Sequence, residues 1–383
     1  MSVSRRGLFE VLSRAGTQSA TARAPLPSAP PGVTEIRISS NENPLGPGKT
    51  VVDAMMTRFG EVGRYPFNNL TANEANLTAA IAAKQQVKPE NVVLAVGSQE
   101  LLRNAVRAFT SPYRHLVTAA PTFENCTKVA SALKHPVVEA KVDSAFKLDL
   151  ESMLATVRGA GLVFVNNPNN PTATVHGIKT ITDFVERVHR VSPDTVIFID
   201  EAYHDYVTDP NYQTAIPLAM AMPNVFVART FSKAYGMAGM RIGYAIGQPD
   251  TIKPLERLRM PMTLSVFTVG AALVALADQK HIDDERARNT AVRDFTMKAF
   301  VDMGCKPTAS QANFLFVDIG RPAQGFRDAC AQKGVIIGRD FPPFENSHAR
   351  ISIGTMAEMT KAVDVFRDIL RPLSPSNAGK GGN

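Results

Sequence analysis

The chain has 383 residues, of which 44% are apolar and 20% charged, and its formal net charge at pH 7 is +7. This length exceeds what one compact core usually holds, so at least two domains are expected. No stretch approaches 18 uninterrupted apolar residues, so neither a membrane-spanning helix nor a membrane partner is expected. Because the lysines and arginines are scattered, a merely basic surface or an acceptor of small anions is favoured over a nucleic-acid-binding protein.

The three cysteines, Cys126, Cys305 and Cys330, lie far apart in the sequence. Their number and spacing match neither a disulfide framework nor a metal site. The histidines also lack the spacing of metal ligands, so no metal is predicted. The cysteines are interpreted as packing thiols.

Residues 1–32 are expected to stay outside the fold. Residues 4–9, Ser-Arg-Arg-Gly-Leu-Phe, match a twin-arginine export signal, but Glu10 and Arg14 interrupt the apolar core that such a signal needs. A disordered tail is therefore favoured, and a cytoplasmic location is favoured over export to the periplasm. Residues 373–383, rich in Gly, Ser and Asn, are predicted to form a second disordered tail.

Short apolar runs rich in β-branched residues alternate with helical patterns between residues 59 and 264. These runs predict strands at residues 92–96, 115–119, 162–165, 196–199, 225–228 and 242–246. The alternation indicates a mostly parallel sheet with helices on both faces. Polar residues follow the carboxyl ends of these strands, where an open α/β sheet binds its ligand.

The pattern changes after residue 264. A long helical stretch over 265–303 precedes short strands at 314–317, 335–337 and 349–353. A last helix carries an apolar stripe at the spacing of an amphipathic helix, formed by Met356, Met359, Val363, Phe366 and Leu370. We predict a large domain over 59–264 and a smaller α/β domain over 265–372, which the N-terminal segment 33–58 joins.

Lys233 directly follows the strand at 225–228 and a short polar turn. Lysine resists burial, so a lysine at this place suggests a function, although solvated lysines are commoner. Thr230 and Ser232 place hydroxyl groups beside it, and Arg241 follows a Gly-rich stretch. Hydroxyl groups together with a guanidinium predict a phosphate site.

A second phosphate-binding element is predicted at Gly97, Ser98 and Gln99. These residues lie where a strand turns into a helix. The backbone N–H groups and the positive end of the helix dipole face an anion at such a turn.

Asp200 ends the apolar strand at 196–199, where a carboxylate needs a partner. One interpretation is a helix N-cap. The other pairs Asp200 with the protonated pyridine nitrogen of pyridoxal 5'-phosphate (PLP), because a carboxylate there keeps the ring cationic. In that interpretation Asn170 and Tyr203 donate hydrogen bonds to the ring oxygen O3′, and Phe123 stacks on the ring.

The motifs follow one another in the order Gly-Ser-Gln, Asn-Pro-Thr, Asp-Glu-Ala-Tyr, Thr-Phe-Ser-Lys and Arg-Ile-Gly-Tyr. This order resembles the fold-type I PLP-dependent aminotransferases of class I and II, most of all the histidinol-phosphate aminotransferase group. The resemblance covers Ser39 to about Leu370. It implies an α/β fold with a mostly parallel seven-stranded sheet sandwiched by helices, plus a smaller α/β C-terminal domain.

The resemblance also implies an activity. A PLP-dependent aminotransferase would move an amino group from an L-amino acid, or an amino-alcohol phosphate such as histidinol phosphate, to a 2-oxo acid such as 2-oxoglutarate. Lys233 would hold PLP as a Schiff base and shuttle a proton between Cα and C4′. Asp200 would pair with the pyridine nitrogen, and Asn170 and Tyr203 would bind O3′. The phosphate would be held by Ser98, Gln99, Thr230, Ser232 and Arg241.

Four further residues receive roles from the resemblance. Tyr65 matches a tyrosine that reaches the phosphate of the neighbouring subunit, which implies a homodimer with shared active sites. Arg350 matches the arginine that clamps the substrate α-carboxylate. Arg339 matches a second substrate arginine of the family. Its ligand stays open: it could bind a phosphate, a distal carboxylate or nothing. Asn43 lies where the family's N-terminal segment closes over the substrate, or is a turn asparagine before proline.

Two segments depart from the family pattern. Ala173 stands where the family usually has glycine, so a slightly different loop is expected. The segment Phe341–Phe344 is unlike the histidinol-phosphate enzymes, which leaves the substrate side chain open. The alternative function on the same scaffold is a PLP-dependent decarboxylase or lyase similar to threonine-phosphate decarboxylase. A PLP-binding regulator is disfavoured, because no winged-helix DNA-binding segment precedes the domain.

Overall fold

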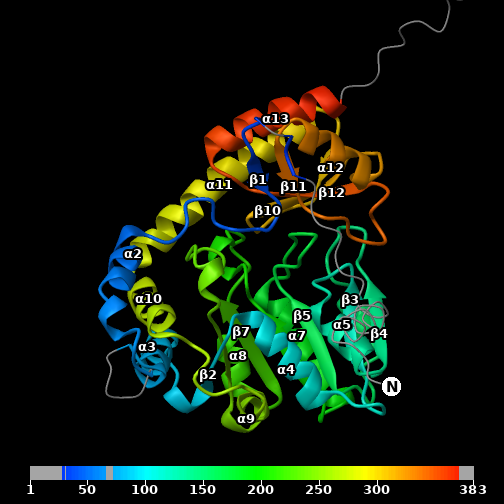
Figure 1. The fold of residues 1–383 in the computed structure, drawn as a ribbon. Coiled ribbons are helices and arrows are strands. Elements are labelled where there is room, and N and C mark those ends of the chain that lie inside the picture. The colour runs from blue at the N-terminus through cyan, green and yellow to red at the C-terminus, as the bar shows by residue number, and fades with distance from the viewer. Residues whose placement is uncertain (1–27, 31, 66–71, 371–383) are drawn as a thin grey trace, which may run out of the picture.

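The computed structural model describes residues 28–30, 32–65 and 72–370. A large sheet with covering helices lies below a smaller layer of helices and short strands (Figure 1). The twin-arginine motif and most of both predicted tails lie outside the described residues. Within the described part, no helix is long and apolar enough to cross a membrane.

Seven strands form the large sheet in the order β2-β8-β7-β6-β5-β3-β4. They are β2 (Val92–Ala95), β3 (Leu116–Ala120), β4 (Val137–Lys141), β5 (Leu162–Asn166), β6 (Val196–Asp200), β7 (Val225–Thr230) and β8 (Gly243–Gly247). Of these seven, β8 runs antiparallel to both of its neighbours, and the other pairs are parallel. The predicted mostly parallel, seven-stranded sheet is therefore confirmed.

The sequence pattern did not reveal β4. This strand lies at the edge of the sheet, where it pairs with β3 alone, and only Ala140 of its five residues is buried. The central strands are buried on both faces and form continuous apolar runs in the sequence. An edge strand needs no such run, because part of it faces solvent.

Helices cover both faces of the large sheet. They are α4 (Ser98–Phe109), α5 (Asn125–Ala132), α6 (Leu150–Leu154), α7 (Ile178–Val191), α8 (Ile216–Ala221) and α9 (Pro249–Arg257). Successive side chains of a strand point to opposite faces. Phe198 of β6 thus packs in the core shared with α4, α5 and α9, whereas its neighbours Ile197 and Ile199 pack in the core shared with α6, α7 and α8.

The helical stretch predicted over 265–303 is two helices, α10 (Val266–Ala277) and α11 (Gln279–Asp302). Asp278 separates them, and its carboxylate caps α11 by accepting a hydrogen bond from the N–H of His281 at 3.0 Å. α10 packs beside α2 (Lys49–Met56) and α3 (Glu74–Gln85) at the flank of the large sheet (Figure 1). The long α11 continues from there into the smaller layer.

The smaller layer joins the two ends of the described chain. β1 (Ile36–Ile38) pairs in parallel with β11 (Val335–Ile337), and β10 (Phe314–Asp318) pairs with β9 (Lys306–Pro307) and β12 (His348–Ser352). α12 (Ala323–Gln332) covers β11 and β12, and α13 (Met356–Leu370) packs against α11 and α12. The N-terminal strand thus lies in one layer with the C-terminal strands. The domain limits at 58, 264 and 372 stay a prediction.

Gly236 lies three residues after Lys233, and its backbone conformation allows a prediction about the stability of the folded chain. Its φ is +69°, and a Cβ there would overlap the backbone of Gly46. We expect Gly236→Ala to lower the free energy of unfolding by at least about 2 kcal/mol, measured from the denaturation midpoint. Gly239→Ala is the matched control, because its Cβ would meet nothing within 4 Å. Equal midpoints for the two variants would contradict the prediction.

Candidate active site

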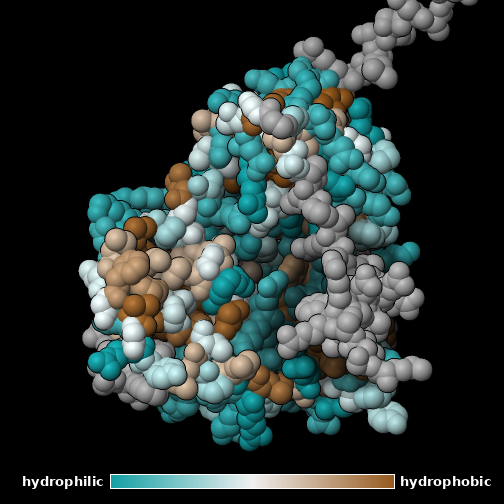
Figure 2. Space-filling view, in the orientation of Figure 1, coloured by the Kyte–Doolittle hydropathy of each residue, from teal (hydrophilic) through white to brown (hydrophobic). Residues whose placement is uncertain are grey.

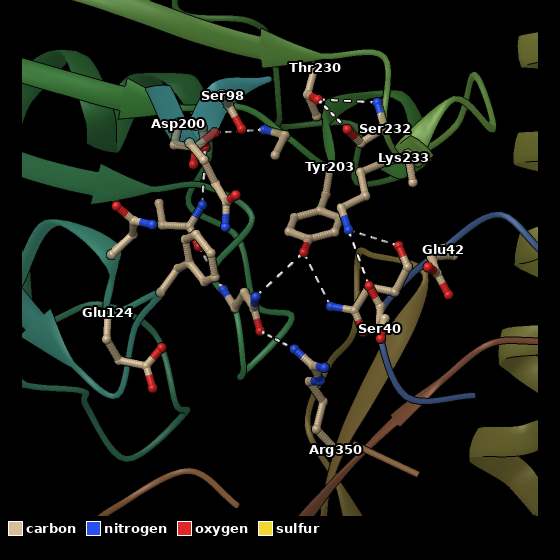
Figure 3. Close-up of a pocket in the computed structure, with 18 of the residues that line it drawn as sticks. Ser40, Glu42, Ser98, Glu124, Asp200, Tyr203, Thr230, Ser232, Lys233 and Arg350 are labelled. Atoms are coloured by element: carbon tan, nitrogen blue, oxygen red, sulfur yellow. Dashed lines mark hydrogen bonds between the residues drawn. The ribbon is translucent and has the colours of Figure 1, made fainter. Parts of the chain in front are cut away.

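A pocket of about 930 Å³ lies at the carboxyl ends of the central strands, beneath the smaller layer (Figure 3). This volume suits a cofactor together with a small substrate. The structure brings most of the residues predicted for the site together there. The predicted residues that line the pocket are Ser98, Gln99, Phe123, Asn170, Asp200, Tyr203, Thr230, Ser232, Lys233, Arg241, Arg339 and Arg350.

Three predicted residues do not line the pocket. Gly97 lies against Arg241, where a Cβ would overlap the guanidinium, so glycine makes room for it. Asn43 is buried, and its side-chain amide donates to the carbonyl of Ala234 at 3.0 Å, which ties the N-terminal segment to the turn after Lys233. Tyr65 is 70% exposed on the outer surface.

One end of the pocket is built to bind an anion. α4 begins at Ser98, and its N-cap residue Gly97 has no side chain to cap the first turn. Thr230 donates a hydrogen bond to Oγ of Ser232 at 2.9 Å, and Nη1 of Arg241 reaches the same oxygen at 3.4 Å. A helix N-terminus, two hydroxyl groups and a guanidinium therefore converge, which is the arrangement that holds a phosphate.

Asp200 ends β6 with a carboxylate that is 2% exposed. Burial raises the pKa of Asp200 to about 7, although the N–H of Ala202 donates to its Oδ1 at 3.1 Å and opposes this shift. Glu201 raises the pKa further, and Lys233 lowers it. A cation beside Asp200 would stabilise the ionised form, so this carboxylate suits a positively charged partner in the pocket.

Lys233 follows β7, and its Nζ donates to the backbone carbonyls of Ser40 at 3.3 Å and Asn41 at 3.0 Å. Burial lowers the pKa of Lys233 to about 8, and the positive charge of Arg350 contributes in the same direction. A neutral amine is therefore available close to neutral pH. A neutral amine can act as a nucleophile or accept a proton.

Tyr203 stands at the centre of the pocket (Figure 3). Its hydroxyl accepts hydrogen bonds from the side-chain amides of Asn41 at 3.1 Å and Asn170 at 3.5 Å. Its ring centre lies 5.5 Å from Nζ of Lys233. Burial raises the pKa of Tyr203, so it stays a hydroxyl group that can donate to a ligand.

Three arginines, Arg327, Arg339 and Arg350, line the side of the pocket formed by the smaller layer. Arg350 of β12 donates to Oδ1 of Asn170 at 2.9 Å and to the carbonyl of Ser39 at 2.6 Å. Arg339 forms an ion pair with Glu124. The guanidinium carbons of Arg339 and Arg350 lie 3.9 and 4.8 Å from the ring centre of Phe341. The segment that departs from the family pattern thus supplies the ring on which both arginines rest.

Ala173, which also departs from the family pattern, lies in a backbone conformation that glycine adopts easily. Ala173 is fully buried with φ of +61°, its N–H donates to the carbonyl of Asn169 at 2.7 Å, and its carbonyl accepts from the N–H of Gln311 at 2.8 Å. These two backbone bonds hold the alanine in the left-handed region. The loop before the site is therefore compatible with Ala at this position.

Sequence reasoning missed several pocket residues. Ser40 and Asn41 hold Lys233 through backbone carbonyls, which leave no trace in side-chain patterns. Glu124 directly follows Phe123, and this adjacency was the one available signal for it. The remaining lining residues that were not predicted are Ser39, Glu42, Asn125, Lys128, Asn166, Ala202, Ala238, Arg327, Asp340 and Pro342.

Residues 33–366 match the family model described as aminotransferase class I and II. The chain belongs to this family. The histidinol-phosphate aminotransferase of Moorella thermoacetica is 34% identical over 88% of this chain and 85% of the relative. The histidinol-phosphate aminotransferase of Anaeromyxobacter sp. is also 34% identical, over 88% of this chain and 92% of the relative. The family and the class of enzyme predicted from the motifs are therefore confirmed.

Solved structures agree with this membership. The histidinol-phosphate aminotransferase of Sinorhizobium meliloti in complex with PLP has a TM-score of 0.80 and 27% identity to this aminotransferase, over 98% of this chain and 96% of the relative. The predicted fold of a fold-type I aminotransferase is confirmed. The described residues of the enzyme contain no group of three His, Cys, Asp or Glu side chains able to hold a metal.

The pKa of Asp200 predicts how stability depends on pH. The raised pKa means that the folded, cofactor-free enzyme loses stability as pH rises from about 4 through about 7, where the buried carboxyl must ionise. Asp200→Asn removes that loss. We expect it to stabilise the cofactor-free enzyme by about 2 kcal/mol more at pH 8 than at pH 5 in urea unfolding. The control is Asp194→Asn at an exposed position. A pH-independent effect of Asp200→Asn would contradict this.

Proposed function

We propose that this aminotransferase holds PLP in the pocket and moves the amino group of an L-amino acid or of histidinol phosphate to a 2-oxo acid. The observation that carries the proposal is the placement of Lys233 and Asp200 in one pocket with a phosphate-binding end. When bound, PLP supplies an electron sink for the electrons released at the substrate Cα. The chain's residues supply attachment, orientation and proton transfer.

The pocket fits PLP in three respects. The phosphate would lie at the first turn of α4 with Thr230, Ser232 and Arg241. A protonated pyridine nitrogen beside the buried carboxyl of Asp200 would stabilise its ionised form, which burial disfavours. Lys233 offers an amine whose lowered pKa favours covalent attachment.

Lys233 moves the proton in the proposed reaction. With cofactor and substrate bound, the amine of Lys233 would accept a proton from the substrate Cα and later give it up again. The carbonyls of Ser40 and Asn41 lie within hydrogen-bond reach of Nζ and would keep the released amine near Cα. The other site residues then serve to orient the reactants.

The orienting roles follow from the contacts. Tyr203 and Asn170 would bind the ring oxygen O3′, and Phe123 would stack on the ring. The Arg350 guanidinium would take the substrate α-carboxylate in exchange for its present oxygen acceptors, as suits a bidentate donor. Asn43 would hold the N-terminal segment over the site through its bond to Ala234.

The substrates are proposed from the relatives and from Arg339. Two curated relatives are named histidinol-phosphate aminotransferases, so histidinol phosphate is the first donor to test and 2-oxoglutarate the first acceptor. Arg339 lines the same pocket as Lys233. It is therefore proposed to face the end of the substrate side chain.

Half-transamination tests the proposed function. The enzyme with bound PLP is mixed in turn with histidinol phosphate and with aromatic, acidic and basic L-amino acids, and the cofactor absorbance is followed. At least one donor should convert the cofactor to pyridoxamine phosphate, and 2-oxoglutarate should restore it. Conversion by none of the donors would refute the transferase function.

Lys233→Ala is the matching variant in that assay. We expect it to lose the visible absorbance of the attached cofactor and to slow amino transfer at least about 1000-fold, since both attachment and proton transfer depend on this amine. Lys179→Ala on the exposed face of α7 is the control and should retain both. A persisting band in Lys233→Ala would assign the attachment to another lysine.

We also propose that the enzyme is a homodimer. Four large apolar side chains are between 45% and 63% exposed along one segment: Val52, Met56, Phe59 and Val62. Figure 2 shows an apolar area on this flank, over α2 and α10. Tyr65 follows the segment and is proposed to reach the phosphate of the neighbouring subunit. A contiguous apolar surface of this kind is typical of an interface.

Met56→Glu tests the dimer. Light scattering should give the unaltered protein twice the mass of one chain. Met56→Glu should raise the dimer dissociation constant at least about tenfold, because it buries a charge in the interface. Met356→Glu on α13 is the control, since Met356 is an exposed methionine outside the apolar segment. An active monomer of the unaltered chain would contradict both the dimer and the shared site.

The proposed location of the enzyme is the cytoplasm, with export through the motif at residues 4–9 as the alternative. Cys126 and Cys330 are buried free thiols, and Cys305 is a partly buried one. Unpaired thiols are what a reducing compartment preserves.

A further inference from the structure

We propose that Glu124 determines substrate specificity by occupying Arg339, so that it competes with any anionic group at the end of the substrate side chain. The inference rests on the proposed function and concerns the same pocket. It makes Glu124 a specificity-determining residue, although no motif marks it.

Glu124 is placed for this role by the start of α5, where it is the residue before Asn125. It lines the pocket on the side away from Lys233 (Figure 3). Its carboxylate forms an ion pair with Nη2 of Arg339, and the two side chains are only 29% and 19% exposed. The partial burial reduces screening by solvent, so this pair is stronger than an ordinary surface pair.

Arg339 is held in position by more than Glu124. Its guanidinium lies 3.9 Å from the ring centre of Phe341, and its Nη1 donates to the carbonyl of Asp340 at 2.8 Å. A ligand that replaced the Glu124 carboxylate would therefore meet a guanidinium that is already oriented. The exchange would be one carboxylate for another, with little rearrangement of the arginine.

Arg350 rests on the same ring, with its guanidinium carbon 4.8 Å from the centre of Phe341. The two arginines thus lie close enough for one small dicarboxylate to contact both. Arg350 is proposed to take the α-carboxylate, so the second carboxylate of such a molecule would reach Arg339. It could do so only when Glu124 gives way.

The neighbouring charges at this end of the pocket are paired as well. Arg327, which also lines the pocket, forms an ion pair with Asp340 at 2.5 Å. Arg327 and Arg339 are therefore each paired with a carboxylate of the protein. A substrate with an uncharged aromatic or imidazole side chain would leave both ion pairs intact. A substrate with a distal carboxylate or phosphate would first have to displace Glu124 from Arg339.

Glutarate and pentanoate measure this competition without turnover. Glutarate carries a carboxylate at both ends, whereas pentanoate has the same chain length and only one. Both are titrated by calorimetry into the enzyme with bound PLP. We expect Glu124→Gln to tighten glutarate binding about threefold to tenfold, the range for a partly buried charge pair, and to leave pentanoate binding unchanged. The Michaelis constant for the dicarboxylate acceptor, 2-oxoglutarate, should fall likewise, while that for the monocarboxylate 2-oxobutyrate stays the same.

Two further variants make the test specific. Glu151→Gln breaks the exposed ion pair with Arg187 on α6 and α7, and should change the binding of neither ligand. Arg339→Met should weaken glutarate binding, and adding Glu124→Gln to it should have no further effect, because the competition acts through Arg339. A gain from Glu124→Gln that persists without Arg339 would overturn the proposal.

Unchanged or weaker glutarate binding in Glu124→Gln would also overturn the proposal. That result would leave the proposed function intact as long as any donor converts the cofactor. Conversely, a tighter glutarate complex without conversion by any donor would refute the transferase function and keep Glu124 as the residue that competes for Arg339.

Discussion

The site depends on the burial of two ionisable groups, Asp200 and Lys233, at the carboxyl ends of two adjacent strands. Each loses solvation, which raises the pKa of the carboxyl to about 7 and lowers the pKa of the amine to about 8. Buried ionisable groups with such shifted pKa values are typical of functional sites. The large sheet places both at one edge, because β6 and β7 are parallel neighbours in register.

The smaller layer completes what the sheet begins. The carbonyls of Ser40 and Asn41 hold the Lys233 amine, and Arg350 reaches Asn170 across the pocket. The pairing of β1 with β11 brings the N-terminal segment to this place. In the proposed function, attachment of the cofactor and binding of the substrate carboxylate would fall to the two sides of one pocket.

The chemistry and the specificity of the proposed reaction rest on different parts of the chain. Asp200, Tyr203 and Lys233 lie on or just after strands of the large sheet, where family motifs occur. Arg339 matches a family arginine, and Phe341 follows it in the segment that departs from the family. Glu124 is the residue before helix α5 on the facing wall. The departing segment therefore lies beside the arginine that is proposed to face the side-chain end of the substrate.

The amino-acid sequence was enough to predict the strands of the large sheet, apart from edge strand β4, and 12 of the 25 residues that line the pocket. Apolar runs mark buried strands, and a lysine or aspartate at the end of such a run is visible locally. The folded chain was needed to find the break at Asp278, the carbonyls around Lys233 and the pairing of Glu124 with Arg339, which lie 215 positions apart. A contact between distant segments has no local pattern, because it depends on how the packed layers meet.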